Sequence, residues 1–475
     1  MRLRSLVACA ALTAGALFYT PSAEACGGCF PPPGEQNSVV TDHRMILSVS
    51  KTQSTLYDQI KYSGSPSEFA WILPISGEVK VGLSADSLFG GLDNLTSVVV
   101  QEPPRNCPPY PASCLRGYSD EAQGAPSYGS SSGGGSFADA GVSVIKSEVV
   151  GPYETVQLHP TSENDVAALE SWLTDHHFNV PDDIKPVIAQ YVKEHFNFLA
   201  LRLVPGKGVS AMRPVRVTTQ GANVALPLRM VAAGTGATVG ITLWVVGEGR
   251  YQPSNFGSFT ITDEELTWDW NTSSSNFKTV RDQKASADPG KLWEIESSIS
   301  TTTSLIQNSA RFQGNVGGQT GGDYLEATDP ATQTTKTTAE VQQEDFDTLF
   351  AGFGGANSYA DVKVTRIRAD LAHAALVTDL TVGASTDQAD LARTRQPKHE
   401  NGQPLCPVYK ECVQTGQVPR DQATAINAQN NLPPNIGGGG TCASTQRRSD
   451  TGVTVVFGFL ALAIGRAIRQ RRKHR

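Results

Sequence analysis

Residues 196–204 read Phe-Asn-Phe-Leu-Ala-Leu-Arg-Leu-Val, a run that is apolar on both faces. Such a run is typical of a strand in the middle of a sheet, because both of its faces must be buried. Two amphipathic helices are expected just before it, one opening at 162–165 and one at 181–183. Strands are expected after it, near 215–219, 224–231 and 238–246, with Pro227 placing the second at an edge or bulge.

The chain on either side continues this mixed pattern. Apolar side chains alternate at Met45, Leu47 and Val49, and a second strand is expected over 68–75, which contains Pro74. Ser84 is expected to cap a short helix that runs to Leu92. Residues 26–385 are therefore predicted to form an α+β body of one or two subdomains, with mostly antiparallel sheets, a few amphipathic helices and a low-complexity loop. A further helix is expected over 344–353, and further strands over 98–101, 362–368 and 376–382. The low-complexity loop is expected at 119–141.

The charge is distributed unevenly along the 475 residues. The formal net charge is −7, from 39 basic and 46 acidic residues. Leaving out eight basic residues at the two ends and Glu24, 31 basic and 45 acidic residues remain, a balance of −14. A body this acidic repels polyanions, so nucleic acid is excluded as a partner.

The N-terminal segment has the pattern of a secretory signal peptide. Residues 1–25 contain Arg2 and Arg4, an apolar stretch, and a small-x-small exit at Ala23-Glu24-Ala25. Cleavage is expected after Ala25, with lipid attachment to the next residue, Cys26, as the alternative. The body is therefore expected to be exported.

The C-terminal segment has the pattern of a membrane anchor. Residues 386–450 are rich in Gln, Asn, Gly and Pro and are predicted to form a flexible, disordered tether. Residues 451–468 are predicted to form a transmembrane helix, and 469–475 a basic cytoplasmic tail that follows the positive-inside rule. The body is thus expected outside the cytoplasmic membrane, at the membrane or the cell surface.

The tail also resembles a known sorting signal. A glycine spacer at 437–440 precedes Cys442, the apolar span and the terminal arginines, an order similar to the myxobacterial C-terminal sorting signal, MYXO-CTERM. The resemblance covers about the last 35 residues. It implies cleavage near Cys442 and delivery to the cell surface.

Seven cysteines remain once the signal peptide, with Cys9, is removed. Disulfides are the default in an oxidising compartment, although spacing alone cannot prove how cysteines pair. One cysteine stays unpaired, Cys442, which is the candidate for sorting or lipidation. Close spacing predicts three pairs that each close a small loop: Cys26–Cys29, Cys107–Cys114 and Cys406–Cys412.

The Cys26-Gly-Gly-Cys29 motif has two other interpretations, a redox dithiol and half of a zinc site. A redox dithiol normally precedes a helix, but Phe30 and three prolines follow here. Cys107 and Cys114 have the wrong spacing for a zinc knuckle. A structural clasp is therefore favoured.

Six stretches of the body have the pattern of a known family: 25–30, 57–71 with Leu73-Pro74, 82–86, 198–202, 225–229 and 243–247. On these stretches, the body resembles the bacterial family known as domain of unknown function 2330. The resemblance covers roughly residues 25–385. It implies an exported protein without an assigned activity, and no catalytic residue can be carried over.

The sequence shows no catalytic constellation, and no cofactor or metal site is predicted. The match to G-x-S-x-G at 129–133 lacks the strand and helix that a nucleophile elbow needs. His176-His177 is expected to end a helix and His195 to lie in the core, each in preference to a metal ligand. Trp268-Asp-Trp270 is expected to face the core in preference to a carbohydrate.

The sequence favours a non-enzymatic protein with a structural or interaction role in the cell envelope. Its expected partners are the membrane, through the C-terminal helix, and envelope proteins or polysaccharides. Two alternatives stay open: an extracytoplasmic hydrolase, for which Asp42, His43 and Glu68 are candidate residues, and a thiol redox protein that uses Cys26 and Cys29.

Overall fold

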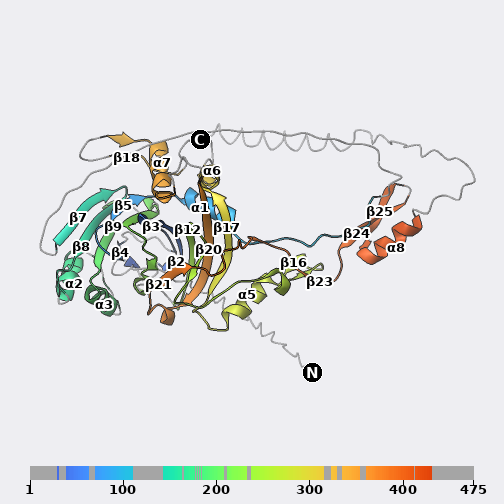
Figure 1. Cartoon of the computed structure of the whole chain (residues 1–475), viewed down its shortest axis with the longest axis horizontal. Coiled ribbons are helices and arrows are strands. Elements are labelled where there is room, and N and C mark those ends of the chain that lie inside the picture. The colour runs from blue at the N-terminus through green and yellow to red at the C-terminus, as the bar shows by residue number, and fades with distance from the viewer. Residues whose placement is uncertain are drawn as a thin grey trace, which may run out of the picture. The chain divides into compact units, whose positions relative to one another are not determined.

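The structure, a computed structural model, divides the chain into two compact units (Figure 1). Unit 1 comprises residues 1–105 and 118–404, and unit 2 comprises residues 106–117 and 405–475. The residues that the structure describes are 29–30, 39–63, 70–110, 143–162, 165–176, 178, 180, 182, 184–207, 211–232, 237–314, 323–328, 334–353, 360–410 and 412–430.

The larger sheet of unit 1 has eight strands. Its middle strands β12 and β2 run parallel, as do β14 and β17 at one edge, and the other neighbours pair antiparallel. Successive side chains of a strand point to opposite faces, so Met45 and Ile46 enter different cores. In spatial order the strands are β14 (Ser258–Phe259), β17 (Trp293–Thr302), β20 (Asp361–Ala372), β12 (Thr238–Gly247), β2 (Val39–Val49), β3 (Gln53–Ser63), β10 (Val215–Gln220) and β5 (Lys80–Leu83).

The smaller sheet of unit 1 has five antiparallel strands, with β9 (Asn197–Leu203) at its centre. All but one of the β9 residues are buried, which confirms the prediction from the sequence. On one side of β4, Pro74 is the partner of Phe198 in β9. On the other side, β1 pairs only with Ala70 and Trp71, so no strand there needs the amide hydrogen that proline lacks. The other strands, in spatial order around β9, are β1 (Cys29–Phe30), β4 (Ala70–Ile75), β8 (Tyr153–His159) and β7 (Ser143–Val150).

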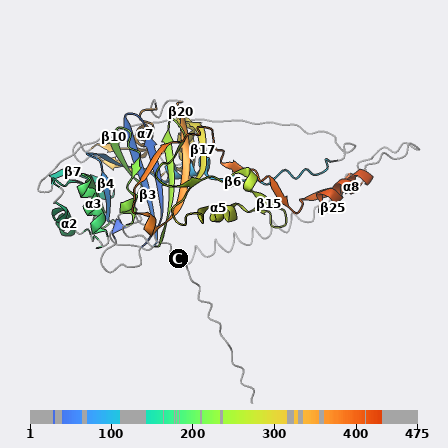
Figure 2. The same ribbon diagram turned by 60° about the horizontal axis from the view of Figure 1, so that its bottom comes forward.

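The main apolar core joins the two sheets. Met45 of β2 and Leu243 of β12 belong to the same buried cluster as Leu199 of β9. The two predicted amphipathic helices contribute Leu173 and Ile188, and they lie beside β4 and β7 (Figure 2). These helices are α2 (Val166–Asp175) and α3 (Lys185–Lys193).

A second core lies on the opposite face of the larger sheet. Trp244 of β12 is fully buried there and packs edge-on against Phe89, 6.1 Å between ring centroids. Two of the covering helices approach closely at Gly91, where an added Cβ would stand 2.6 Å from the backbone nitrogen of Ala310. The helices that supply this core are α1 (Asp86–Thr96), α6 (Thr303–Gly314) and α7 (Thr338–Leu349).

Short strands and helices complete unit 1. The predicted strand 224–231 is wrong after Leu226, because Pro227 ends β11 (Ala225–Leu226) and the short helix α4 (Leu228–Val231) follows. The remaining elements are α5 (Phe277–Ala285) and the strands β6 (Val99–Val100), β13 (Tyr251–Pro253), β15 (Thr267–Asp269), β16 (Ser274–Ser275), β18 (Ala327–Thr328), β19 (Thr335–Lys336), β21 (Leu380–Ala384), β22 (Thr394–Arg395) and β23 (His399–Asn401).

The described residues of unit 2 form a hairpin and one helix, packed on a remote segment. The hairpin strands β24 (Leu405–Lys410) and β25 (Val413–Pro419) pair antiparallel, and α8 (Arg420–Asn430) follows directly. Residues 106–110, nearly three hundred positions earlier, belong to the same unit. Its buried cluster contains Cys406, Val408 and Ala423.

The α+β prediction is confirmed by mostly antiparallel strands and by the eight α-helices of the described residues. The tether predicted over 386–450 is corrected for 386–430, where β22, β23, β24, β25 and α8 form. The residues of these elements are polar because the elements are small and half-exposed. The strands β22 and β23 pair with strands far away in the sequence, and β24 pairs with β25; composition alone does not reveal such pairing.

Several predicted segments lie outside the described residues: the signal peptide 1–25, the loop 119–141, the residues 431–450, the anchor 451–468 and the tail 469–475. Within the part of the chain that is described, no helix is long and apolar enough to cross a membrane.

Candidate functional site

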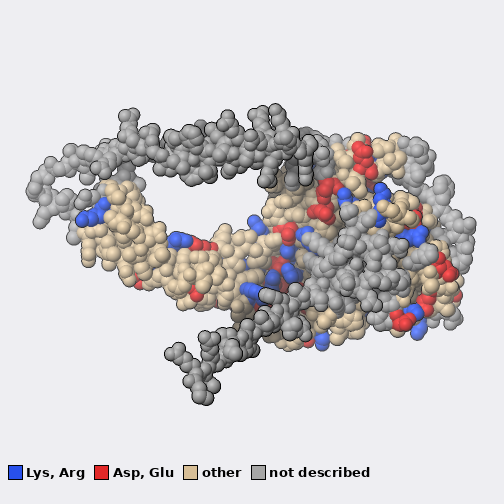
Figure 3. Space-filling view, turned by 180° about the vertical axis from the view of Figure 1, so that it is seen from behind, with Lys and Arg blue, Asp and Glu red and all other residues tan. Residues whose placement is uncertain are grey.

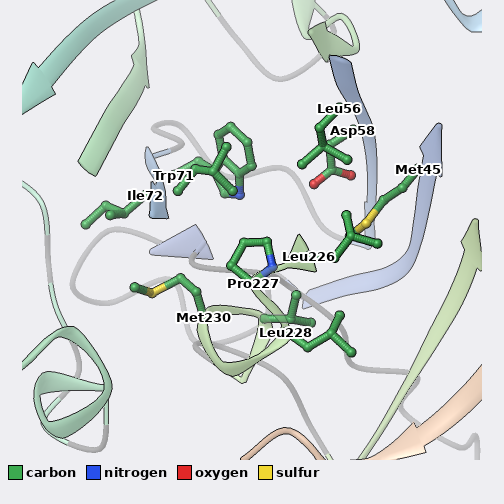
Figure 4. A pocket seen from close by; sticks show the side chains of 11 residues that line it. Met45, Leu56, Asp58, Trp71, Ile72, Leu226, Pro227, Leu228 and Met230 are labelled. Atoms are coloured by element: carbon green, nitrogen blue, oxygen red, sulfur yellow. The ribbon is translucent and has the colours of Figure 1, made fainter. Parts of the chain in front are cut away.

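A small pocket lies where β2, β3, β4 and the β11–α4 segment meet (Figure 4). The volume open to the centre of a water-sized sphere is about 20 Å³, slightly more than one water molecule needs. Ten of its eleven lining side chains are apolar, and the exception is Asp58. The lining residues are Met45, Leu56, Asp58, Trp71, Ile72, Leu73, Leu226, Pro227, Leu228, Met230 and Val231.

Local backbone geometry brings these side chains together. Met45 and Asp58 are direct cross-strand partners in the β2–β3 ladder. Trp71 belongs to β4, whose six residues are all buried. Pro227 stops β11 and turns the chain so that Met230 of α4 closes the pocket from another side.

Asp58 is the polar group of the pocket, and its side chain is 5% exposed. Its Oδ1 lies 3.2 Å from Nδ1 of His43, which is fully buried. Figure 4 shows the carboxylate directed toward the space between Trp71 and Leu226. The site therefore presents one carboxylate, held by an imidazole, in an otherwise apolar enclosure.

A second buried carboxylate, Asp345 of α7, lies on the opposite face of the larger sheet. Its Oδ1 accepts from Nη1 of Arg216 at 2.9 Å, and its Oδ2 accepts from Tyr324 at 2.8 Å and from Ser84 at 2.5 Å. Tyr57 donates to the Asp345 carbonyl at 3.3 Å. Both carboxylate oxygens are thus bound, as a buried charge requires.

Burial sets the protonation of this cluster. It raises the pKa of Asp345 by desolvation, against the opposing charge of Arg216. Burial, then the Asp345 charge, raises the pKa of Tyr57 and of Tyr324, so both stay neutral donors. The predicted cap at Ser84 is wrong, because its hydroxyl is drawn to Asp345 and Ala85 occupies the cap position without a side-chain bond.

A row of ion pairs attaches α5 to the larger sheet. Arg281 of α5 donates to Glu294 and to Glu296 of β17, at 2.5 Å each. Arg366 of β20 donates to Glu296 and to Asp93 of α1. Burial opposes ionisation of Asp93, but the hydrogen bond and charge of Arg366 outweigh it and lower its pKa. These ion pairs connect the helices α5 and α1 to the strands β17 and β20 of the larger sheet.

On the face of the described residues that Figure 3 shows, Lys/Arg and Asp/Glu side chains are interspersed. In the same part of the chain, no three His, Cys, Asp or Glu side chains lie close enough to hold a metal ion.

The three hydrolase candidates are only partly described. His43 meets Asp58, a residue that the sequence had not singled out. The side chain of Asp42 and the whole of Glu68 lie outside the described residues. The sign that could have identified Asp58 is its place between Leu56 and Ile60, where a carboxylate alternates with apolar residues as on one face of a strand.

The two histidine predictions have different outcomes. His176 follows the last residue of α2 and stacks on Trp172, 3.8 Å between centroids, so its place at a helix end is confirmed. His177 lies outside the described residues. The core position predicted for His195 is wrong: α3 ends at Lys193, and His195 is exposed with φ +63°.

The two indoles of the Trp-Asp-Trp motif have different surroundings. Trp268 is 8% exposed, which agrees with a core-facing indole. Trp270 is half-buried, donates to Glu400 at 2.7 Å and lies under the guanidinium of Arg105. Contacts within the protein therefore engage both rings.

The predicted cysteine pairs at 107–114 and 406–412 are corrected. Cys107 forms a disulfide with Cys406, with a Cα–Cα distance of 5.4 Å and a separation of 299 residues. Cys412 is also disulfide-bonded. Spacing failed because the hairpin packs against residues 106–110, which puts remote cysteines in contact. Cys26, Cys114, Cys442 and the Cys29 side chain lie outside the described residues.

The fold and these sites define an α+β protein with two cores and a small disulfide-closed unit. The chain belongs to the family described as an uncharacterized protein conserved in bacteria (DUF2330), which matches residues 20–311. This span contains every residue that lines the pocket. No curated protein matches the chain.

Two solved structures show a low similarity. The chain is 11% identical to baculovirus P35, with a TM-score of 0.24 over 46% of this chain and 66% of that chain. It is 13% identical to a chain of the caspase-8/P35 complex, with a TM-score of 0.23 over 44% and 64%. The chain thus spans less than two thirds of the length of either matched chain. TM-scores this low support no conclusion about function.

Proposed function

We propose that this is an exported protein, held at the cell membrane or surface by its C-terminal segment, with a structural or interaction role in the envelope. The observation that carries the proposal is the Cys107–Cys406 disulfide of unit 2. Protein disulfides persist in oxidising compartments and are rare in the bacterial cytoplasm.

The composition of unit 2 explains why this bond matters. Its buried cluster holds Cys406, Val408 and Ala423, with a few half-buried neighbours. A hairpin with one helix and so small a core does not bury enough apolar surface to stay folded alone. Small units of this kind depend on disulfides, and therefore on export.

The two ends of the sequence give independent support. A signal peptide over 1–25 would direct export, and an apolar segment over 451–468 followed by arginines would stop in the membrane. The hairpin and helix of unit 2, residues 405–430, precede that segment in the sequence. Processing at Cys442 would instead release the protein to the surface, as in the sorting signal that the tail resembles.

Fractionation of cells tests the proposal. The wild type is compared with Cys442→Ala and with a truncation after Asp450, and the two ends of each product are identified by mass. We expect an N-terminus at Cys26 and a membrane or surface location for the wild type. Release by the truncation alone supports a retained anchor, and mislocalisation of Cys442→Ala supports processing.

The matched control is Cys9→Ala, a cysteine that leaves with the predicted signal peptide and should change nothing. A full-length, uncleaved chain with reduced cysteines in the cytoplasm contradicts the proposal. So does an unchanged location of both the truncation and Cys442→Ala.

A further inference from the structure

We infer that Asn401, the last residue of β23, is a site of spontaneous deamidation that Asp269 of β15 restrains, and that its conversion makes the opening of the β15–β23 pair irreversible. The substrate is the asparagine amide itself, and the co-reactant is water. Nothing in this inference depends on where the protein is located in the cell.

The reactive dipeptide is Asn401-Gly402, which is the one Asn-Gly in the 475 residues. An asparagine amide is attacked by the backbone nitrogen of the residue that follows it. Glycine hinders this attack least, because it has no Cβ. The side chain of Asn401 is exposed, so water reaches the product of the attack.

The reaction is balanced without an oxidant or a reductant. The nitrogen of Gly402 gives up its proton and forms a bond to Cγ of Asn401, while the bond from Cγ to Nδ2 breaks and ammonia leaves. Water then opens the cyclic imide at one of its two carbonyls. The product is an aspartate or an isoaspartate, in which the main chain passes through the former side-chain carbonyl.

The folded chain restrains this amide. Nδ2 of Asn401 donates to Oδ2 of Asp269 at 2.7 Å, and the two residues are direct partners in the parallel β15–β23 ladder. Hydrogen bonds from the backbone of Asn271 and from the side chain of Asn401 lower the pKa of Asp269, so the acceptor is ionised at neutral pH. The amide must therefore leave a charge-assisted hydrogen bond before it can turn toward Gly402.

The pair that holds the amide is small enough to open. β23 is three residues long, all of them exposed, and it lies at the edge of the three-stranded sheet β16–β15–β23. Short exposed edges open locally far more often than core strands do. Each opening frees the amide to react.

Conversion prevents the pair from closing again. The product carries a carboxylate in place of the donor amide, directly opposite the carboxylate of Asp269, and like charges in such positions destabilise a sheet. An isoaspartate also adds a methylene to the main chain and displaces the carbonyl of Asn401, which accepts from the backbone N–H of Trp270 at 2.9 Å. A reversible opening thus becomes permanent.

Peptide mass spectrometry of the purified full-length chain, aged at mildly alkaline pH, tests the site. The same chain unfolded in urea is the unprotected reference. We expect Asn401 to lose ammonia in the folded chain at least about tenfold more slowly than in urea. Asp269→Ala should accelerate the loss about three- to tenfold, because the charged acceptor is gone.

The internal control is Asn271, an exposed asparagine of the same region that is followed by Thr272. It should keep its amide in the folded chain, since a β-branched side chain crowds the attacking nitrogen. The matched variant is Asn401→Gln, which keeps an amide but would have to close a larger and less favourable ring. It should abolish the mass change at this position.

The permanent opening is tested with Asn401→Asp, which imitates one product. Amide hydrogen exchange over 267–270 should become at least about threefold faster than in the wild type, and exchange in the large sheet should not change. Circular dichroism verifies that each variant is folded.

The inference is overturned if Asn401 keeps its amide in the folded chain after the urea reference has fully reacted, or if both react equally fast. Equal rates in the wild type and in folded Asp269→Ala overturn the restraint by Asp269. Unchanged exchange over 267–270 in Asn401→Asp overturns the irreversible opening. Loss of ammonia at Asn271 as fast as at Asn401 equally overturns the site.

Discussion

Unit 1 and unit 2 are held together in different ways. Unit 1 buries apolar side chains on both faces of an eight-stranded sheet and inserts paired charges between its layers. Unit 2 buries little and is closed by a disulfide between residues 299 positions apart. The comparison teaches that one chain can stabilise a large domain by burial and a small one by covalent connection.

The six tryptophans make the comparison measurable, because all of them belong to unit 1. Tryptophan fluorescence therefore follows the unfolding of unit 1, and proteolysis within 405–430 follows that of unit 2.

The largest effect is expected from Arg216→Met in unit 1. This change removes the cation bound to the fully buried Asp345 and leaves its charge uncompensated. Breaking a buried ion pair in this way lowers the free energy of unfolding by about 3–5 kcal/mol. Urea titration followed by tryptophan fluorescence measures it. The double variant Arg216→Met with Asp345→Leu should recover part of the loss, and a loss below about 1 kcal/mol contradicts the prediction.

In unit 2, Cys406→Ser is expected to cost about 2–5 kcal/mol of local stability, the usual effect of losing a native disulfide. Trypsin should then cut at Lys410 and Arg420 much faster than in the wild type. The fluorescence transition of unit 1 should stay at the same urea concentration. If the free energy of unfolding of unit 1 fell by as much as that of unit 2, the two units would not unfold independently.

A smaller effect is expected from Gly91→Ala, with Gly90→Ala as its matched control. The new Cβ at 91 would stand 2.6 Å from the Ala310 backbone, which must move, at a cost of about 1–3 kcal/mol. At 90 the nearest atom is in the Gln313 side chain, 3.5 Å away, so alanine should stabilise α1 by up to about 1 kcal/mol. Equal urea midpoints for the two variants would refute the close helix contact.

The smallest effect concerns Asp93, whose pKa is lowered below its ordinary value of 3.8 in the folded state. A lowered carboxylate pKa stabilises the fold above pH 3.8, and this contribution is lost as the pH falls through the folded value. The wild type should therefore lose more stability than Asp93→Asn between pH 5 and about pH 3. Parallel urea curves at the two pH values would contradict the ion pair with Arg366.

The sequence predicted most of what local patterns determine. The run at 196–204 became the central strand β9, because a stretch that is apolar on both faces can be satisfied only inside a sheet. Helices were found near their expected positions, although α3 ends before His195 and leaves that residue in solvent. The edge position of Pro74 followed from its missing amide hydrogen.

What the sequence could not predict depends on contacts between remote residues. The pocket combines Asp58 with Trp71 and Met230, which are brought together by two sheets and a proline-ended strand. The hairpin of unit 2 was hidden because its residues are polar and its partner segment lies at 106–110. The disulfide was mispredicted for the same reason.

The order in which the two cysteines emerge has a consequence for biogenesis. A chain that is synthesised or translocated from its N-terminus presents Cys107 long before Cys406, when Cys26, Cys29 and then Cys114 are the thiols that can react with it. An early bond between neighbours must later be exchanged for the native one, by attack of a thiolate on the first disulfide. Maturation of this protein should therefore require a thiol isomerase, and cells without one should accumulate shuffled forms.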